Sequence, residues 1–540
     1  MKFVTDPSIP TKIEKMKQRV RWHDSAIVQR HIDQTRLVLE DGQEDRSAQG
    51  GSTERSEFSF LVLGDSGTGA HRGYDPQRRI GKMMAEQRED CRFVIHTGDV
   101  VYLVGSSEYY WQNFILPYRE FLVGGEALEA YQHSRRSRHI HYDQMQFNLP
   151  FFPVLGNHDY YDLPIAFGAL AQSFYPIRRL LRSKIDFDIG WHGSYQGGAF
   201  AKAFMDCLHE RSGQELEQHL DRYYTAEWGS HRCLSYQPKL FTRLPNRYYS
   251  FRVGGIDFIA LDSNTFNAPA PLPNTPEGQA YRQGLEQRRR EIIAEKQALV
   301  AELVTIGNSS DEDELIDDKR TKIEQLEEVE RDLDQQLETR RPPAVDQEQL
   351  QWLEQRLIES WHTDSVRGRV LFFHHPPYVT EASKWHQAQT LAVRQRLRQV
   401  LENVVKAIGE RRGNRPVVDL ILNGHAHCLE HLKTEENGLA DAGIDCLVCG
   451  GSGYSLRRQR VEGDLLTETV VLDGRAQNIS VARSRLFVGR NGQGSQKRRP
   501  YSFLKIDVQE GNPPRYVVRP FVAEWYQKQW DTYPLQPFTI

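Results

Sequence analysis

Five short apolar runs in this chain each end in residues that can bind a metal ion. Each run is short enough for one buried β-strand, and each is followed by a glycine or a bend. Strands buried on both faces are typical of α/β domains, in which ligands collect at the carboxyl ends of the strands. We therefore expect the five ends to converge on one site. The runs are FSFLVLGDSG (58–67), RFVIHTGDVVY (92–102), FFPVLGNHD (151–159), RVLFFHHPPY (369–378) and VDLILNGHAH (418–427).

Further strands are expected beside the five. The run GIDFIALDSN (255–264) is a sixth apolar segment, and we expect an adjacent strand whose end is less diagnostic. Residues 454–540 contain alternating runs such as TETVVLDG and YSFLKIDV, which predict antiparallel strands.

One segment of this 540-residue chain is much more polar than the rest. Between 277 and 343, apolar residues recur every seven positions with charged residues between them, which indicates two helices of a coiled-coil hairpin. Proline ends the second helix at Arg341-Pro342-Pro343. We expect an exposed insertion that adds little to a site at the strand ends and that serves self-association or a protein partner. The apolar positions are Leu285, Ile292, Leu299 and Ile306, then, after the break GNSSDEDE (307–314), Ile316, Ile323, Leu326, Leu333 and Leu337.

The remaining segments suggest how the chain is divided. Residues 1–57 end in a linker-like stretch and are predicted to be an N-terminal extension, and 58–540 to be one catalytic domain. Within that domain, 160–248 is a second insertion, rich in aromatic and basic residues. Because it directly follows GNHD, it is a candidate lid over the site, although packing on the domain would also explain it.

Charge and cysteine content exclude several classes of function. A net charge of −4 argues against nucleic acid or an anionic membrane as partner. Neither an export signal nor a membrane-spanning run is evident, so a cytoplasmic location is expected. Six cysteines are too few for a disulfide framework. Cys446 and Cys449 form a CxxC, which we interpret as buried strand residues rather than a redox or metal pair.

Each strand end alone has an ordinary explanation, such as a helix cap or a hydrogen-bonded histidine. The segment GDSGTGAHRG lacks the GK[ST] of a phosphate loop, so its glycines are expected to serve a tight turn. Five ends with acids, a tyrosine, an amide and histidines together predict a metal centre. Two ions about 3.5–4 Å apart supply a nucleophile and neutralise phosphoryl oxygens in phosphate-ester hydrolysis, and a carboxylate must bridge them. Oxygen donors mixed with imidazoles favour iron, manganese or zinc over magnesium or calcium.

The ordered motifs GDSG, GDVVY, GNHD, HHPPY and GHAH resemble those of the calcineurin-like metallophosphoesterases. Asp65-Ser66-Gly67 stands where most of that superfamily has Asp-x-His, and Tyr102 completes GDxxY, which is similar to the purple acid phosphatase branch. The resemblance implies an α/β (α+β) fold, a four-layer β-sandwich flanked by helices. Here it would carry the inserted hairpin.

The resemblance also implies roles for individual residues. Asp65, Asp99, Tyr102 and His427 would bind the first metal, and Asp99, Asn157, His374 and His425 the second, with a hydroxide completing the bridge. His158 would be catalytic, as a general acid or hydrogen-bond donor to the phosphate, and Asp159 would orient it. His375 would face the substrate or pack. Tyr160, Tyr161 and Tyr378 are candidate pocket walls for which packing is favoured.

The function implied is metal-dependent hydrolysis of small phosphate monoesters. The cofactors would be two metal ions, iron paired with iron, manganese or zinc. Two alternatives stay open from the sequence: a phosphodiesterase or nucleotide hydrolase, and a coiled-coil scaffold with a vestigial site. No metal ligand is missing, which argues against the vestigial site.

Overall fold

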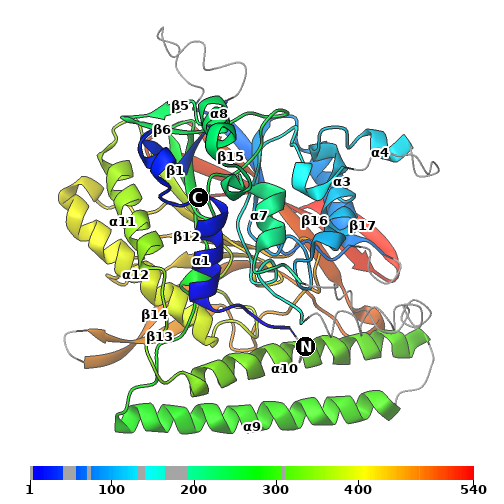
Figure 1. The fold of residues 1–540 in the computed structure, drawn as a ribbon. Helices are drawn as coiled ribbons and strands as arrows, with labels where there is room; N and C mark the ends of the chain where they lie inside the picture. Colours follow the sequence, from blue (N-terminus) through cyan, green and yellow to red (C-terminus); the bar gives the residue numbers. More distant parts are fainter. Residues whose placement is uncertain are drawn as a thin grey trace.

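The computed structural model describes residues 4–40, 56–69, 74–130, 140–164, 193–305, 310–472 and 475–540. Two mixed β-sheets lie at its centre and helices cover their outer faces (Figure 1). The expected sandwich of sheets flanked by helices is therefore confirmed.

The smaller sheet holds the first three motif strands. β2, β3 and β4 are neighbours and parallel, so their carboxyl ends share one edge. The C-terminal strands join beside β2 in antiparallel order, as the alternating pattern predicts. The strands of this sheet are β2 (Phe58–Leu63), β3 (Cys91–His96), β4 (Phe151–Pro153), β15 (Arg499–Gln509), β16 (Arg515–Tyr526), β17 (Gln529–Pro534) and β18 (Phe538–Thr539).

The larger sheet holds the other two motif strands at its centre. β8, β9, β10 and β12 are successively parallel, so the sixth apolar run is the neighbour of the fourth, as expected. In spatial order its strands are β13 (Leu465–Leu472), β14 (Arg475–Val488), β11 (Leu429–Thr434), β12 (Asp445–Cys449), β10 (Leu420–Asn423), β9 (Gly368–Phe372), β8 (Ile256–Ala260), β7 (Tyr249–Val253), β1 (Ile32–Leu39), β6 (His231–Tyr236) and β5 (Ala226–Trp228).

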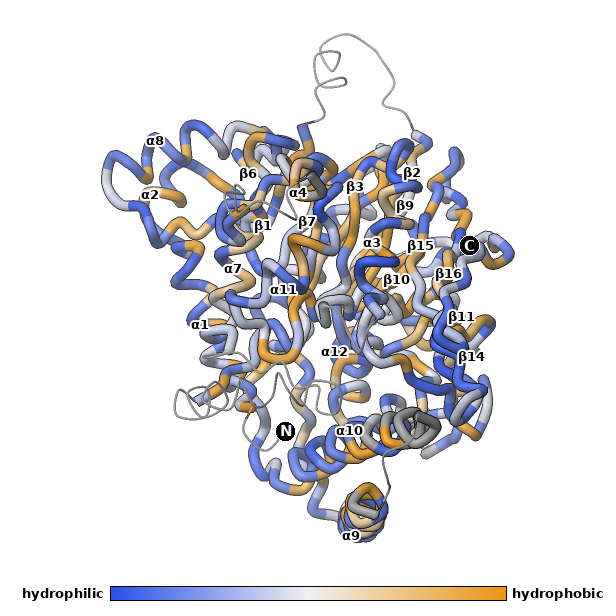
Figure 2. Tube along the Cα trace, turned by 90° about the vertical axis from the view of Figure 1, so that its right-hand side faces the viewer, coloured by the Kyte–Doolittle hydropathy of each residue, from blue (hydrophilic) through white to orange (hydrophobic). Residues whose placement is uncertain are grey.

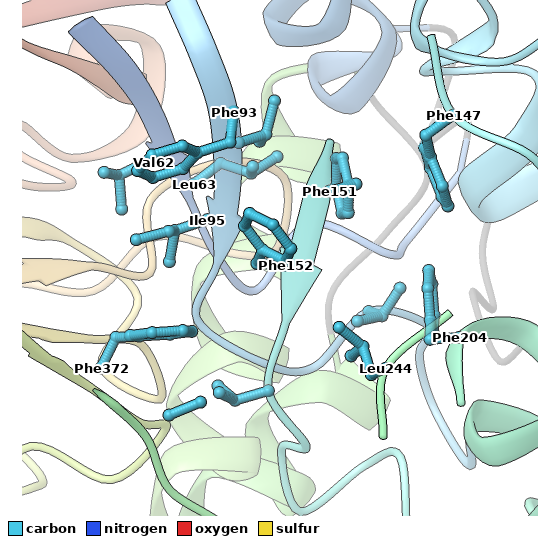
Figure 3. Packing of buried hydrophobic residues seen from close by; sticks show 14 of the residues in the cluster. Val62, Leu63, Phe93, Ile95, Phe147, Phe151, Phe152, Phe204, Leu244 and Phe372 are labelled. Atoms are coloured by element: carbon cyan, nitrogen blue, oxygen red, sulfur yellow. The ribbon is translucent and has the colours of Figure 1, made fainter. Parts of the chain in front are cut away.

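Side chains between the two sheets form the main hydrophobic core. Phe60 and Phe93 of the smaller sheet meet Phe258 of the larger one edge to face, with ring centroids 5.4 and 5.0 Å apart. Phe152 and Phe372 extend the same core (Figure 3). Because successive strand residues point to opposite faces, Ile259, which follows Phe258, belongs to the core cluster formed with the helices α11 and α12. This alternation explains why the motif strands are continuously apolar.

Helices form the outer layers. α11 (Gln347–His362) and α12 (Ala388–Ile408) bury leucines and valines against the far face of the larger sheet. α3 (Pro76–Glu86) contacts β15 and β16. Within the described residues, the other α-helices are α1 (Ile9–Arg19), α2 (Ser25–Val28), α4 (Ala127–Ala130), α7 (Gly198–Phe204), α8 (Gly213–Tyr223), α9 (Pro276–Thr305) and α10 (Ser310–Glu338). Among the described residues, no helix is both long and apolar enough to span a membrane.

The N-terminal region is part of the sandwich. β1 pairs with β6 and β7 in parallel, so residues predicted to form an extension contribute a strand to the larger sheet. α1 contacts the 3-10 turn Ser263–Thr265, just beyond β8. The chain before α1 therefore reaches the edge at which the motif strands end.

The heptad segment forms the expected antiparallel hairpin, in which α10 lies between α9 and the rest of the molecule (Figures 1 and 2). Leu285 and Ile292 of α9 pack against Leu326 and Leu333 of α10. The predicted break at 307–314 is too long, because α10 already begins at Ser310; Ile306 lies outside the described residues.

Candidate metal centre

The loops that follow β2, β3, β4, β9 and β10 bring all seven predicted ligands together. Three loops come from the smaller sheet and two from the larger, so the site lies where the two sheets meet. Each ligand side chain belongs to a residue at most 9% exposed. The seven residues are Asp65, Asp99, Tyr102, Asn157, His374, His425 and His427.

One group of ligands surrounds the Tyr102 hydroxyl. It donates to Asp99 Oδ2 at 2.8 Å or Asp65 Oδ1 at 3.0 Å, and lies 3.3 Å from His427 Nε2. His427 Nε2 is itself 3.5 Å from Asp65 Oδ1. These are the residues assigned from the sequence to the first metal.

The second group surrounds the amide oxygen of Asn157. His374 Nε2 and His425 Nδ1 each lie 3.0 Å from Asn157 Oδ1. His374 Nε2 is also 3.4 Å from Asp99 Oδ2. The same carboxylate oxygen thus contacts a member of each group, which is the position that a bridging ligand requires.

The orientation of the imidazoles fits a cation. His374 Nδ1 donates to the carbonyl of Thr97 at 2.9 Å, and His427 Nδ1 to that of Ser455 at 3.2 Å. These outer hydrogen bonds direct the Nε2 lone pairs inward, as in metal-binding histidines. Asn157 Oδ1 is an acceptor as well, so acceptor atoms face one another and need a cation between them.

The electrostatics favour a cation as well. Burial alone would lower the pKa of His374, but Asp99 and Asp65 outweigh it and raise that pKa to about 9. Burial, and then the same two carboxylates, raise the pKa of the Tyr102 phenol well above its ordinary value. In the absence of a metal ion, protons therefore stay on His374 and Tyr102. A bound metal ion would take their place and neutralise the carboxylates. The mixed oxygen and nitrogen donors suit iron, manganese or zinc.

The backbone at the ligands is constrained. Asp65, Asp99 and His425 have φ of 53°, 54° and 65°, in the left-handed region that non-glycine residues seldom adopt. Such conformations cost about 1–3 kcal/mol each and concentrate at functional sites. Glycines beside the ligands allow close approach: a Cβ on Gly156 would lie 2.1 Å from Asp99 Oδ1, and one on Gly424 would lie 2.5 Å from Asp65 Oδ2.

His158 lies at the edge of the centre, with its ring beside Tyr102 and a centroid separation of 4.3 Å. Its Nδ1 is 2.6 Å from the carbonyl oxygen of Leu103, which leaves Nε2 for the cavity that His158 lines. Burial lowers the pKa of this imidazole. With Nδ1–H donating to Leu103, the neutral ring presents Nε2 as an acceptor, and Nε2 becomes a donor toward the cavity when the ring is protonated.

The prediction that Asp159 orients His158 is wrong. The Asp159 carboxylate is buried and accepts hydrogen bonds from the backbone N–H groups of Val100 at 3.1 Å and Gly156 at 2.9 Å. It joins the loops after β3 and β4. Asp159 is thus a structural residue, because a carboxylate engaged by backbone donors on both loops fixes their spacing and leaves the imidazole to Leu103.

The other residues in the motifs pack away from the cavity. His375 uses both ring nitrogens elsewhere, with Ser263 Oγ at 2.8 Å and Asn267 Nδ2 at 3.3 Å, so it is not placed as a ligand. Tyr160 donates to Asp262 and Tyr378 to Asp441, which confirms packing for both. Cys446 and Cys449 are buried, unpaired residues on β12, as predicted.

A cavity of about 990 Å³ opens over the centre. Asp99, Tyr102, Asn157, His158, His425 and His427 line its floor. Tyr161 is the one described residue of the candidate lid 160–248 on its wall; FYPIRRLLRSKIDF lies outside the described residues. N-terminal residues between Val4 and Lys12 line another side.

The hairpin forms a further wall, so the expectation that it adds little to the site is wrong. Heptad spacing predicted the contact with α9 but gave no information on the rest of the α10 surface, which carries most of the wall residues; Ile323, predicted for the contact with α9, lines the cavity. Lys384 and Tyr454, the latter stacked on Tyr102 at 4.2 Å, also line the cavity, and no motif pointed to them. The wall residues on α10 are Thr321, Ile323, Glu324, Glu327, Glu328, Arg331, Asp332, Asp334, Gln335 and Glu338.

Comparison with protein-family models finds a match over part of the chain. The sequence model of the calcineurin-like phosphoesterases matches residues 58–237, about a third of the chain, which confirms the resemblance. No curated protein matches the chain. His374, His425 and His427 lie beyond the matched residues, yet the structure brings them to the ligands within them.

Three solved structures found by comparison each share 12% sequence identity with this chain. GAP50, the anchor in the inner membrane complex of Plasmodium, has a TM-score of 0.35 with 89% of each chain covered. The purple acid phosphatase PPD1 from yellow lupin seeds has a TM-score of 0.40, with 90% of this chain and 54% of that chain covered. PhoD has a TM-score of 0.36, with 91% and 70% covered. Likeness at this level does not decide between their functions.

Proposed function

Because residues 58–237 carry a calcineurin-like phosphoesterase domain, we propose that the chain is a metal-dependent phosphoric ester hydrolase acting on phosphate monoesters at a dinuclear centre. The observation that carries the proposal is the position of Asp99 Oδ2. It lies 2.8 Å from the Tyr102 hydroxyl and 3.4 Å from His374 Nε2, and so between two groups of ligand atoms. One carboxylate oxygen between two donor sets is what a pair of ions requires.

The chain's own residues suggest how the chemistry is divided. Two bound ions would supply a nucleophile and neutralise the phosphoryl oxygens. Asp65, Tyr102 and His427 would hold one ion, and Asn157, His374 and His425 the other, with Asp99 shared. In its protonated form His158 would donate a hydrogen bond or proton from Nε2, on the cavity side of the ring, to the departing oxygen. Asp159 would keep the two ligand loops at a fixed spacing.

Tyr102 supports a purple acid phosphatase-like branch. Its hydroxyl lies among Asp65, Asp99 and His427, where an additional histidine would otherwise be needed. A phenolate is a hard oxygen donor that suits iron(III), and the other ion would be iron, manganese or zinc. The identity of the metals and the cytoplasmic location are predictions from the sequence.

The cavity volume supports a second candidate. About 990 Å³ is far more than a phosphate group fills, so the leaving group of a phosphodiester or a nucleotide would also fit. The vestigial-site reading is less well supported, because all seven ligand side chains converge. Association through 277–343 stays a prediction for the outer helix α9.

The test is hydrolysis of a matched set of esters by the purified protein loaded with Mn, Fe or Zn. The set should contain alkyl and aryl monoesters with the corresponding diesters, and Asn157→Ala should serve as the ligand-deficient control. We expect metal-dependent release of phosphate from monoesters and little from diesters. Faster cleavage of diesters than of monoesters would identify the protein as a phosphodiesterase instead. The absence of turnover with every metal and ester would refute the hydrolase.

A further inference from the structure

A residue of the inserted hairpin reaches the centre through one buried lysine. Glu328 of α10 forms an ion pair with the ammonium group of Lys384, which belongs to the segment between β9 and α12. Lys384 Nζ is 3.0 Å from His425 Nε2, on the side of the ring opposite the atom that faces Asn157. Glu328, Lys384 and His425 therefore form a continuous chain from the hairpin to a metal ligand.

Lys384 is an unusual cation for its surroundings. Its side chain is 3% exposed, yet it lines the cavity next to the metal ligands. A buried charge needs a partner, and Glu328 is that partner. Burial alone would raise the pKa of Glu328, but Lys384 outweighs it and lowers that pKa to about 2. The pair is thus a carboxylate facing a cation at the wall of the cavity.

The position of Glu328 is fixed by a second contact one helical turn along α10. Both carboxylate oxygens of Asp332 accept the backbone N–H of Ala388, the first residue of α12, at 3.0 Å. Residues four apart lie on the same face of a helix. The contact of Asp332 therefore also fixes the position of Glu328 relative to the metal centre. Gln387 Nε2 also donates to Glu328 at 3.1 Å.

An ammonium group has three N–H donors, of which Glu328 takes one within the described part of the chain. His425 Nε2 accepts a second only while His425 Nδ1 carries the ring proton; when Nδ1 binds a metal ion, Nε2 carries that proton and the second donor is available as well. A phosphate ester bound to the centre brings two negative charges into a site whose ligands are already carboxylates. A positioned cation on the cavity wall would offset that charge and hydrogen-bond to a phosphoryl oxygen.

From these contacts we infer that Lys384 binds the substrate phosphate and that Glu328 of the inserted hairpin is the residue that positions it. The inference rests on the proposed hydrolase function and adds a phosphate contact to it. Glu328 acts only through Lys384. The hairpin is accordingly a part of the catalytic pocket, and α9 supports it from outside.

The test is the affinity for inorganic phosphate in the metal-loaded, full-length protein, measured both as competitive inhibition of ester hydrolysis and by calorimetry. Lys384→Met keeps the apolar stem and removes the charge. It should weaken phosphate binding and raise KM by about 10–100-fold, the span for a hydrogen bond to a charged group, at unchanged metal content. Lys384→Arg should restore much of the affinity, because it keeps a cation.

Glu328→Gln tests the positioning role without altering Lys384. We expect it to weaken phosphate binding by about tenfold or less, and to add nothing when combined with Lys384→Met, because residues acting through one contact are not additive. The matched control is Glu330→Gln, which removes an ion pair of the same kind with Lys296 on α9, two positions away and facing outward. It should leave phosphate affinity unchanged.

Several outcomes would overturn the inference. Lys384→Met with unchanged phosphate affinity would show that the pair only attaches the hairpin, as would additive effects of the two variants. An equal loss in Glu330→Gln would attribute the effect to hairpin stability. If wild type hydrolyses no ester, the proposed function fails separately, since calorimetry still reports whether phosphate binds and whether Lys384 matters. If Lys384→Met does not fold, the phosphate affinities of Glu328→Gln and Lys384→Arg test the inference in its place.

Discussion

Asp99 Oδ2 accepts the Tyr102 hydroxyl at 2.8 Å and is the atom that both groups of ligands share. Asp99→Asn should therefore lower metal content from two ions per chain to one or none and abolish turnover, because a neutral amide cannot bridge two cations with the charge of a carboxylate. Elemental analysis of the purified protein measures this. Asp507→Asn, at a surface ion pair with Arg519, is the control. Two metals with full turnover in Asp99→Asn would refute the site assignment.

The proposed purple acid phosphatase-like branch can be tested spectroscopically through Tyr102. A protein loaded with iron(III) should absorb visible light through the Tyr102 phenolate, and Tyr102→Phe should remove the band. Tyr454→Phe is the control, because its ring stacks on Tyr102 at 4.2 Å without being among the ligands. Active, colourless wild type containing manganese would exclude iron and leave the hydrolase in place.

The motif glycines should be intolerant of a single methyl group. Gly156→Ala places a Cβ 2.1 Å from Asp99 Oδ1, so either the carboxylate or the loop must move. Such overpacking typically costs about 1–3 kcal/mol, and here it displaces the shared ligand. We expect lower metal content and a lower Tm.

Gly284→Ala is the matched control for that change. Gly284 lies inside α9, where an added Cβ meets nothing within 4 Å. Because alanine favours the helix, this variant should stabilise α9 by about 0.5–1 kcal/mol and leave metal content unchanged. A fully loaded Gly156→Ala protein would show that the loop relaxes.

The ligands of the candidate site could be predicted from the sequence, whereas the wall of the cavity could not. The five strand ends and their order predicted all seven of the side chains that the structure brings together, because an acid or histidine after a buried strand has few other reasons to recur. The wall of the cavity was not predictable in this way. Lys384 and Glu328 are 56 residues apart and meet only when α10 packs over the strand ends. Asp159 looked catalytic from its neighbour His158, but its backbone partners become visible only in three dimensions.

The place of the N-terminal region in the larger sheet could not be predicted, for a similar reason. β1 follows two short helices and precedes a polar stretch, so its apolar residues carried no motif. Its partners β6 and β7 lie some 200 residues later, and parallel pairing across that separation leaves no local pattern. The heptads, in contrast, predicted the hairpin, since a repeat of seven residues specifies a local helix pair.

The contact between Asp332 and α12 should make stability depend on pH. Burial raises the pKa of Asp332 to about 6, with Glu328 adding to the rise. Because the folded-state pKa lies above the unfolded value, the protonated acid stabilises the fold at low pH. That contribution is lost as pH rises from about 4 to 6, by about 3 kcal/mol for two pKa units.

Asp332→Asn should remove this dependence while keeping one acceptor for the Ala388 N–H. We expect the free energy of unfolding of the variant to exceed that of wild type at pH 7 and to match it near pH 4, measured by denaturant titration at both values. Asp334→Asn, on the partly exposed side facing Arg289, is the control. A constant difference between Asp332→Asn and wild type at the two pH values would contradict the prediction.

His158 offers the sharpest test of chemistry, because its role depends on the leaving group. Its Nδ1–H donates to Leu103 and its ring lines the cavity, so the protonated ring would donate from Nε2, and His158→Ala should remove that donor to the departing oxygen. An alkyl alcohol leaves as a basic alkoxide and needs that donor, so its ester should react about 10²–10⁴-fold more slowly. A nitrophenolate leaves readily and should lose much less.

Metal content separates this role from that of a ligand. It should stay unchanged in His158→Ala and fall in His427→Ala, whose Nε2 faces Tyr102 and Asp65. Equal losses for alkyl and nitrophenyl esters would indicate that His158 binds the phosphate uniformly in ground and transition states. Loss of a metal would place its imidazole among the ligands. A rate loss confined to alkyl esters, at full metal content, would identify His158 as the acid, since of these outcomes only proton donation scales with leaving-group basicity.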